Sequence, residues 1–141
     1  VGIKEASSER ERMQALLAYQ SDRFAVLSGD DPTALRAMLD GARGVISVAA
    51  NAAPGAFAAM CEHATACDAD GATRADARLQ PLYEFLGVEP NPIPVKWLVS
   101  ALGFGTPELR LPLVPLSPAH HARGREILVR LGLIEGARAV S

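Results

Sequence analysis

Short apolar segments alternate with stretches of helical periodicity along the first 67 residues, and this alternation limits the possible folds more than any other feature. The apolar segments are residues 1–4, 24–28 and 44–49. The third is almost continuously apolar, which is typical of a parallel strand buried on both faces. Strands that alternate with helices through short loops predict parallel strands joined by right-handed crossovers, and therefore an α/β fold.

Each predicted strand is followed by a segment with helical periodicity. The first helix is expected to begin at Ser7 or Ser8. In the second, Asp31 is placed as the N-cap, and Pro32 occupies the first helical position, where its missing N–H costs nothing. A third and longer helix is expected over residues 54–66.

The pattern changes after about residue 67, because no further strand of this kind follows. We therefore divide the chain into residues 1–67, which alternate strands and helices, and residues 68–141, an all-helical region. In chain order the second region is expected to contain a helix over 69–85, a Pro-rich connector over 89–94, a helix over 95–102, an extended segment over 109–115 and a helix over 118–131 capped by Ser117.

Composition and charge exclude several classes of protein. The chain has 141 residues, of which 49% are hydrophobic and 21% charged, as expected of one globular domain. Its net charge of -2 gives no electrostatic reason to expect nucleic acid or an anionic membrane as partner. No apolar run reaches the roughly 18 residues of a membrane-spanning helix. Cys61 and Cys67 lie in a predicted helical segment where they would point apart, so we expect free thiols and a cytoplasmic location.

Lys4 is the candidate nucleophile. In the first strand Gly2 and Lys4 point to one face, and Val1 and Ile3 point to the other. If the apolar pair packs under helices, Lys4 faces the interior of a barrel, where partial dehydration favours a neutral amine that attacks carbonyl carbons. A lysine at a strand end that simply reaches solvent is the commoner arrangement, and the strand pattern alone does not decide between the two.

Four motifs connect this lysine to a known family. They are VGIKEA at residues 1–6, LSGDD at 27–31, GVISV at 44–48 followed by Asn51, and NPIPVKW at 91–97. In order and spacing they resemble the C-terminal half of the dihydrodipicolinate synthase family, within the superfamily of pyruvate-dependent class I aldolases that includes N-acetylneuraminate lyase. The resemblance runs from residue 1 to residue 133. It implies strands six to eight of a (β/α)8 TIM barrel with their helices, followed by a C-terminal helical region.

The resemblance implies a role for several residues. Lys4 matches the lysine that forms a Schiff base with pyruvate, which becomes an enamine and attacks aspartate semialdehyde. Ile46 matches a residue that contacts bound pyruvate. As an apolar residue in a predicted buried strand, it is equally well explained as a core isoleucine. Gly29 and Asp30 match positions at the mouth where the second substrate enters. Asp30 and Asp31 also read as helix-capping carboxylates. All lie at C-terminal ends of predicted strands, where barrel enzymes keep their sites.

Cofactors and partners follow from the same resemblance. No cofactor is required, because the lysine itself activates pyruvate, and no metal site is expected. The implied partners are pyruvate, aspartate semialdehyde, the N-terminal half of the barrel and further copies in a homotetramer. The family's acid–base tyrosines, threonine and carboxylate-binding arginine belong to that other half. Tyr19 and Tyr83, placed on helices away from strand ends, are not expected to replace them.

Other candidate residues receive structural interpretations. His63 and Cys67 stand four apart on a helix, but two ligands without a third seldom hold a metal. We expect His120 and His121 to be solvated and Trp97 to be a packing residue.

Three functions therefore remain open. The leading one is a lyase that condenses pyruvate with aspartate semialdehyde in lysine (diaminopimelate) biosynthesis. The second is a sugar-acid aldolase of the same superfamily, of the N-acetylneuraminate or keto-deoxy-gluconate type. The third is a non-catalytic fragment or assembly module, since three strands cannot close a barrel and an isolated half would expose unpaired strand edges. The isolated chain is therefore expected to be unstable and inactive.

Overall fold

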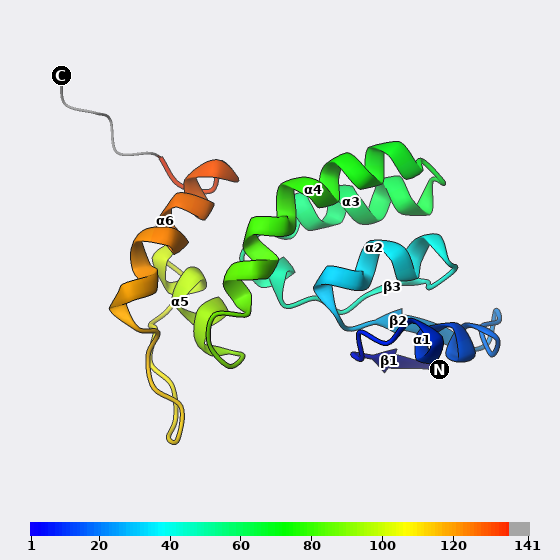
Figure 1. Ribbon diagram of the computed structural model, residues 1–141, viewed down its shortest axis with the longest axis horizontal. Helices are drawn as coiled ribbons and strands as arrows, with labels where there is room; N and C mark the ends of the chain where they lie inside the picture. Colours follow the sequence, from blue (N-terminus) through cyan, green and yellow to red (C-terminus); the bar gives the residue numbers. More distant parts are fainter. Residues whose placement is uncertain (136–141) are drawn as a thin grey trace.

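Three strands and six α-helices make up the part of the chain that the structure, a computed structural model, describes, residues 1–135 (Figure 1). Strands and helices alternate at first, and helices follow one another afterwards. The elements are β1 (Gly2–Glu5), α1 (Arg10–Leu17), β2 (Ala25–Ser28), α2 (Asp31–Leu39), β3 (Gly44–Val45), the 3-10 helix η1 (Ala49–Asn51), α3 (Pro54–Thr65), α4 (Ala69–Leu86), α5 (Ile93–Ala101), the 3-10 helix η2 (Pro118–His120) and α6 (His121–Arg130).

The strands form one parallel sheet in the order β1-β2-β3. Lys4 of β1 pairs with Leu27 of β2, and Ser28 of β2 pairs with Val45 of β3. The predicted α/β alternation with parallel strands is therefore confirmed. Because all three strands run the same way, their C-terminal ends meet at one edge of the sheet.

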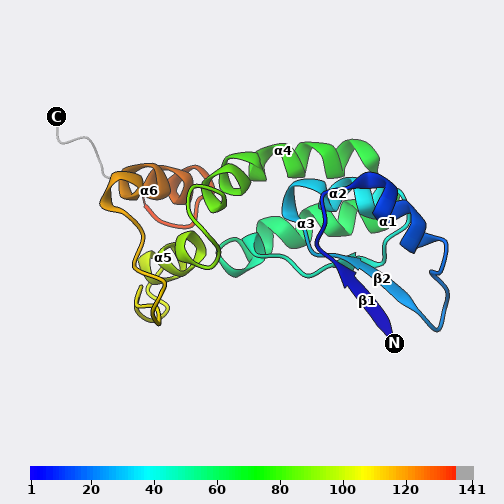
Figure 2. The ribbon, with the colours of Figure 1, turned by 60° about the horizontal axis from the view of Figure 1, so that its bottom comes forward.

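Helices α1 and α2 cover one face of the sheet, as Figure 2 shows. Ile3 and the fully buried Val26 pack there against Met13 of α1 and Ala37 of α2. The expectation that Val1 shares this packing is wrong, since Val1 is fully exposed. Alternation along β1 then turns Lys4 toward the opposite face of the sheet.

The main core lies around α3 and α4 and extends to α5 and α6 (Figure 1). Each large side chain buried there stabilises the fold by about 1.5–3 kcal/mol relative to its exposure to water. Both sides of the predicted boundary at residues 67 and 68 contribute to this core, and the division into two regions stays a prediction. The largest fully buried side chains of this core are Phe85, Met60, Leu79, Leu82, Leu98 and Leu128.

Several element boundaries differ from those that the sequence predicts, and α1 begins only at Arg10. β3 ends at Val45 rather than near Ala49, because the backbone turns into η1. α5 begins at Ile93, two residues before the predicted start, so the end of the Pro-rich connector is helical. Pro94 fits there because the first turn of a helix needs no N–H donor from it.

The last helix begins as predicted, with a side-chain cap. The Ser117 hydroxyl accepts a hydrogen bond from the Ala119 N–H at the start of η2, which continues directly into α6. Within residues 1–135 no helix has both the length and the hydropathy needed to cross a bilayer.

Candidate active site

Parallel pairing brings the four predicted site residues to one edge of the sheet. Lys4 stands one residue before the end of β1, Gly29 and Asp30 directly follow β2, and Ile46 directly follows β3. Two backbone hydrogen bonds continue the ladder beyond the strands. Gly29 N–H donates to the Glu5 carbonyl at 2.7 Å, and Ile46 N–H donates to the Ser28 carbonyl at 2.8 Å.

Lys4 and Ile46 border the same hollow, which has a volume of about 360 Å³. Both side chains are exposed, and 49% of Ile46 is accessible, so it does not behave as an ordinary core isoleucine. Its exposed apolar surface faces the hollow that Lys4 also lines. The remaining lining residues are Ser47, Val48, Asn51, Asn91, Pro92, Val95, Lys96 and Val99.

Gly29 lies directly against the side chain of Lys4. A Cβ atom at this position would stand 2.9 Å from Lys4 Cγ and would collide with Lys4 Cε. The aliphatic chain of Lys4 therefore needs a residue without a side chain beneath it. Glycine is required at position 29 because the Lys4 side chain approaches its Cα closely, and not because the backbone turns there.

Gly29 and Asp30 also border a second hollow, of about 230 Å³, which shares Val48 and Asn91 with the first. The two hollows therefore adjoin each other at the C-terminal edge of the sheet. The second is also lined by Asp31, Pro32, Tyr83, Leu86 and Gly87.

The capping role expected of Asp31 is wrong, because the N-cap of α2 is Asp30 and Asp31 is already helical. The buried Asp31 carboxylate instead accepts hydrogen bonds from the Val48 and Ala49 N–H groups at 3.1 and 2.8 Å, at the start of η1. Asp30 makes no side-chain cap either, and its carboxylate accepts from the Thr33 hydroxyl. Asp31 thus ties α2 to the loop that carries Ile46, and this anchoring turns the chain away from a longer β3.

Tyr83 lies nearer to the strand ends than expected, because α4 carries it to the wall of the second hollow. Its hydroxyl donates to Asp76 Oδ1 at 3.1 Å. Burial, and then the negative charge of Asp76, raise the pKa of Tyr83 well above its usual value, so the phenol stays protonated. Burial also raises the pKa of Asp76. Tyr19 follows α1 and is 72% exposed.

Several lining residues were not assigned a role from the sequence. Ser47, Asn51, Asn91 and Lys96 all lie in the motifs that resemble the synthase family, and all four border the hollow of Lys4. Their polar side chains, placed among apolar motif residues, are the signal that could have identified them.

The remaining candidate residues have structural partners. His63 Nδ1 lies 2.8 Å from the Asp68 carboxylate, and Cys67 is an exposed free thiol. Throughout the described residues no three His, Cys, Asp or Glu side chains stand close enough to hold a metal. His121 is not solvated as expected. It stacks on the buried Trp97 with ring centroids 4.8 Å apart, and its Nε2 lies 3.1 Å from the Leu116 carbonyl oxygen.

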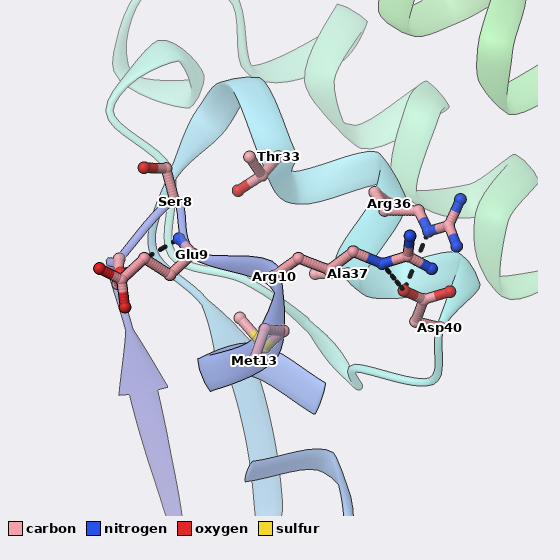
Figure 3. Close-up of a pocket in the computed structure, with 9 residues that line it drawn as sticks. Ser8, Glu9, Arg10, Met13, Thr33, Arg36, Ala37 and Asp40 are labelled. Carbon is pink, nitrogen blue, oxygen red and sulfur yellow. Dashed lines mark hydrogen bonds and ion pairs between the residues drawn. The ribbon is translucent and has the colours of Figure 1, made fainter. Parts of the chain in front are cut away.

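A separate hollow of about 200 Å³ lies between α1 and α2, where Met13 and Ala37 provide apolar surface (Figure 3). At its rim the Arg36 Nε lies 2.9 Å from an oxygen of Asp40, and the Arg10 Nε lies 3.9 Å from the same oxygen. Exposed ion pairs of this kind contribute about 0–1 kcal/mol to the free energy of unfolding. This hollow shares no lining residue with that of Lys4, since the helices that form it pack on the other face of the sheet.

Comparison with known proteins gives one consistent result. A 4-hydroxy-tetrahydrodipicolinate synthase of Stenotrophomonas maltophilia is 53% identical over 135 residues, which are 96% of this chain and 45% of that protein. The protein of the same name from Xanthomonas axonopodis pv. citri is 56% identical over 120 residues, 85% of this chain and 39% of the relative. The chain thus spans less than half the length of these relatives.

Solved structures agree with the sequence relatives. The dihydrodipicolinate synthase of Aquifex aeolicus has a TM-score of 0.89 at 37% identity, over 94% of this chain and 45% of that one. The chloride-inhibited enzyme of Acinetobacter baumannii in complex with pyruvate has a TM-score of 0.88 at 41% identity, over 95% of this chain and 46% of that one. Residues 1–130 match the dihydrodipicolinate synthetase family. The resemblance seen in the four motifs is therefore confirmed, and the chain belongs to the dihydrodipicolinate synthetase family.

Proposed function

We propose that this chain carries the Schiff-base lysine of a lyase that condenses pyruvate with aspartate semialdehyde in lysine biosynthesis. The observation that carries the proposal is the placement of Lys4 and Ile46 around one hollow at the C-terminal edge of a parallel sheet. Family membership supports it, as does the relative from Acinetobacter baumannii that is described in complex with pyruvate.

The chemistry begins at Lys4. Its neutral amine adds to the C2 carbonyl of pyruvate, and loss of water leaves an imine. Removal of a proton from C3 gives an enamine, whose C3 then forms the new carbon–carbon bond with the aldehyde carbon of aspartate semialdehyde. The amino group of the aspartate semialdehyde part then adds to C2 and displaces the lysine amine, which frees the enzyme. The lysine thus supplies the electron sink itself, so the proposal includes no cofactor and no metal.

The neighbouring residues have positioning roles in this scheme. Ile46 presents apolar surface to bound pyruvate, and Gly29 leaves the space through which the Lys4 side chain extends. Gly29 and Asp30 border the adjoining hollow, where we place the entry of the aldehyde. The groups that move protons are proposed to come from a segment outside this chain.

A complete barrel is part of the proposal. We assign β1, β2 and β3 to strands six to eight of a (β/α)8 TIM barrel, whose remaining strands come from an N-terminal segment. Three strands with a strand tilt typical of barrels do not close on themselves, so those strands would pair with the free edges of β1 and β3. We further propose a cytoplasmic homotetramer. One structural neighbour is described as a monomeric variant, so assembly is open to direct measurement.

The test uses a completed barrel, defined as this chain preceded by the part of the Stenotrophomonas maltophilia relative that lies before the match. We predict that Lys4→Arg abolishes turnover of pyruvate and aspartate semialdehyde, because a guanidinium stays protonated and forms no imine. Turnover within about tenfold of the parent would overturn the assignment, because loss of a covalent nucleophile costs far more. Assay with N-acetylneuraminate distinguishes the sugar-acid aldolase, and absence of any turnover in a folded parent indicates the non-catalytic module.

A further inference from the structure

The chain contains two lysines, Lys4 and Lys96, among its 14 basic residues Lys and Arg. The other positively charged positions are therefore arginines. Both lysines border the hollow of about 360 Å³ at the C-terminal edge of the sheet. Lys96 reaches it from the first turns of α5, with its backbone N–H donating to the Pro92 carbonyl at 2.9 Å. A chain that otherwise uses arginine thus places both of its ammonium groups around one space.

The hollow offers no negative charge to neutralise these ammonium groups. Its lining contains no Asp or Glu, and its walls are the apolar side chains of Ile46, Val48, Val95 and Val99 together with two asparagines. A concave surface with charge of one sign and apolar walls concentrates the electrostatic field and raises the local concentration of ions of opposite charge.

The two carboxylates of the adjoining hollow are engaged elsewhere. Asp31 accepts from the Val48 and Ala49 N–H groups, and Asp30 accepts from the Thr33 hydroxyl. Lys96 also borders a further hollow, of about 580 Å³, together with Glu108, yet among residues 1–135 Lys96 forms no ion pair. Its charge is therefore available to an anion that enters the hollow.

We infer that Lys96 is a positioning residue that draws the carboxylate of the incoming 2-oxo acid into the hollow, while Lys4 forms the covalent bond. This inference rests on the proposed function, whose substrates both carry carboxylates. An ammonium suits the task because it is a compact and strongly hydrated point charge, whereas a guanidinium holds carboxylates in a fixed bidentate geometry. An ammonium that attracts the carboxylate without bidentate hydrogen bonds also allows the product carboxylate to dissociate.

The experiment measures how the initial rate of borohydride trapping depends on pyruvate concentration in the completed barrel. For Lys96→Gln we expect the pyruvate concentration at half-maximal rate to rise about five- to tenfold at low ionic strength, with the same maximal rate. Lys96→Arg keeps the charge and should stay within about twofold of the parent. Arg125→Gln removes an equal charge from an exposed position on α6 and should change nothing.

Salt separates attraction of substrate from a structural role. As sodium chloride shortens the screening length from about 30 Å at 0.01 M to about 3 Å at 1 M, the difference between parent and Lys96→Gln should vanish. A difference that persists at high salt, or a Lys96→Gln variant identical to the parent at low salt, would overturn the inference. A parent that forms no Lys4 adduct at any pyruvate concentration overturns the proposed function, and this inference with it.

Discussion

Lys4 and Gly29 are the residues at which the geometry of the site is tightest. The side chain of the lysine passes over the glycine, and a Cβ atom there would stand 2.9 Å from Lys4 Cγ. Gly29 itself lies outside the left-handed region, so its backbone accepts an L residue without strain. An added methyl group would therefore act on the lysine and leave the local backbone as it is.

We predict that Gly29→Ala in the completed barrel slows borohydride trapping of pyruvate about 10- to 100-fold, because a displacement of the nucleophile by about 1 Å has effects of this size. The measurement is the initial trapping rate at saturating pyruvate. Gly55→Ala is the matched control, since a Cβ at Gly55 meets no atom within 4 Å. Equal trapping rates in the parent and Gly29→Ala would show that Lys4 does not need this space.

At the scale of elements, the sequence predicts the helices and strands that local periodicity determines. It does not predict the boundaries and contacts that depend on residues distant in sequence. The alternation of strands and helices, the long α4 and the Ser117 cap follow from local signals. β3 is shorter than predicted because Asp31, distant in sequence, binds the N–H groups of Val48 and Ala49. The stacking of His121 on Trp97 likewise depends on the packing of α6 against α5, which no local pattern encodes.

The same reasoning applies to the site. The strand pattern predicts that Lys4 lies at the end of β1. The motifs add Gly29, Asp30 and Ile46 to the candidate site. Asn91 and Lys96 are distinguished in their motif by polar side chains, but only the packing of α5, beyond the turn after α4, brings them to the hollow.

Helix α6 packs through a glycine. A Cβ on Gly124 would stand 2.7 Å from Phe85 Cζ and would collide with the ring of Trp97. We predict that Gly124→Ala lowers the free energy of unfolding of the completed barrel by about 1–3 kcal/mol, as overpacking of a core does. Urea denaturation measures it, and Arg125→Ala, exposed on the same helix, should change it by less than about 0.5 kcal/mol. Equal stability of the parent and Gly124→Ala would mean that α6 does not pack closely on α5.

The N-cap of helix α4 is Asp68, a residue whose charge depends on pH. The Asp68 carboxylate accepts from the Gly71 N–H at 2.9 Å and contacts His63, and these two interactions hold the pKa of Asp68 below its usual 3.8. A lowered pKa in the folded state means that the stabilisation is complete above pH 3.8 and is lost as the pH falls through the folded-state value.

We therefore expect the free energy of unfolding to decrease as the pH falls below about 4, partly because Asp68 becomes protonated. Asp68→Asn keeps a side-chain cap but does not titrate, so its unfolding free energy should depend less steeply on pH over this range. Urea denaturation at a series of pH values gives the slope. Identical slopes in the parent and Asp68→Asn would show that this carboxylate does not contribute to acid sensitivity.

On the scale of the whole molecule, one side of the sheet is packed under helices and the other carries Lys4, the proposed nucleophile. Helices α1 and α2 cover the face of Ile3 and Val26 (Figure 2). Alternation along β1 turns Lys4 to the opposite face. The main core around α3 and α4 lies beside this sheet and extends to α6. In the proposed barrel, further strands from a segment outside this chain enclose Lys4.

Reductive trapping shows whether Lys4 forms a covalent imine with pyruvate, on which the proposed function depends. The completed barrel is incubated with pyruvate and borohydride, and its intact mass and tryptic peptides are then measured. Because the chain has two lysines, the peptides of Lys4 and Lys96 are distinguished without ambiguity. The account predicts one reduced pyruvate on Lys4 and none on Lys96. No adduct in a folded protein, or an adduct on Lys96 instead, would contradict it.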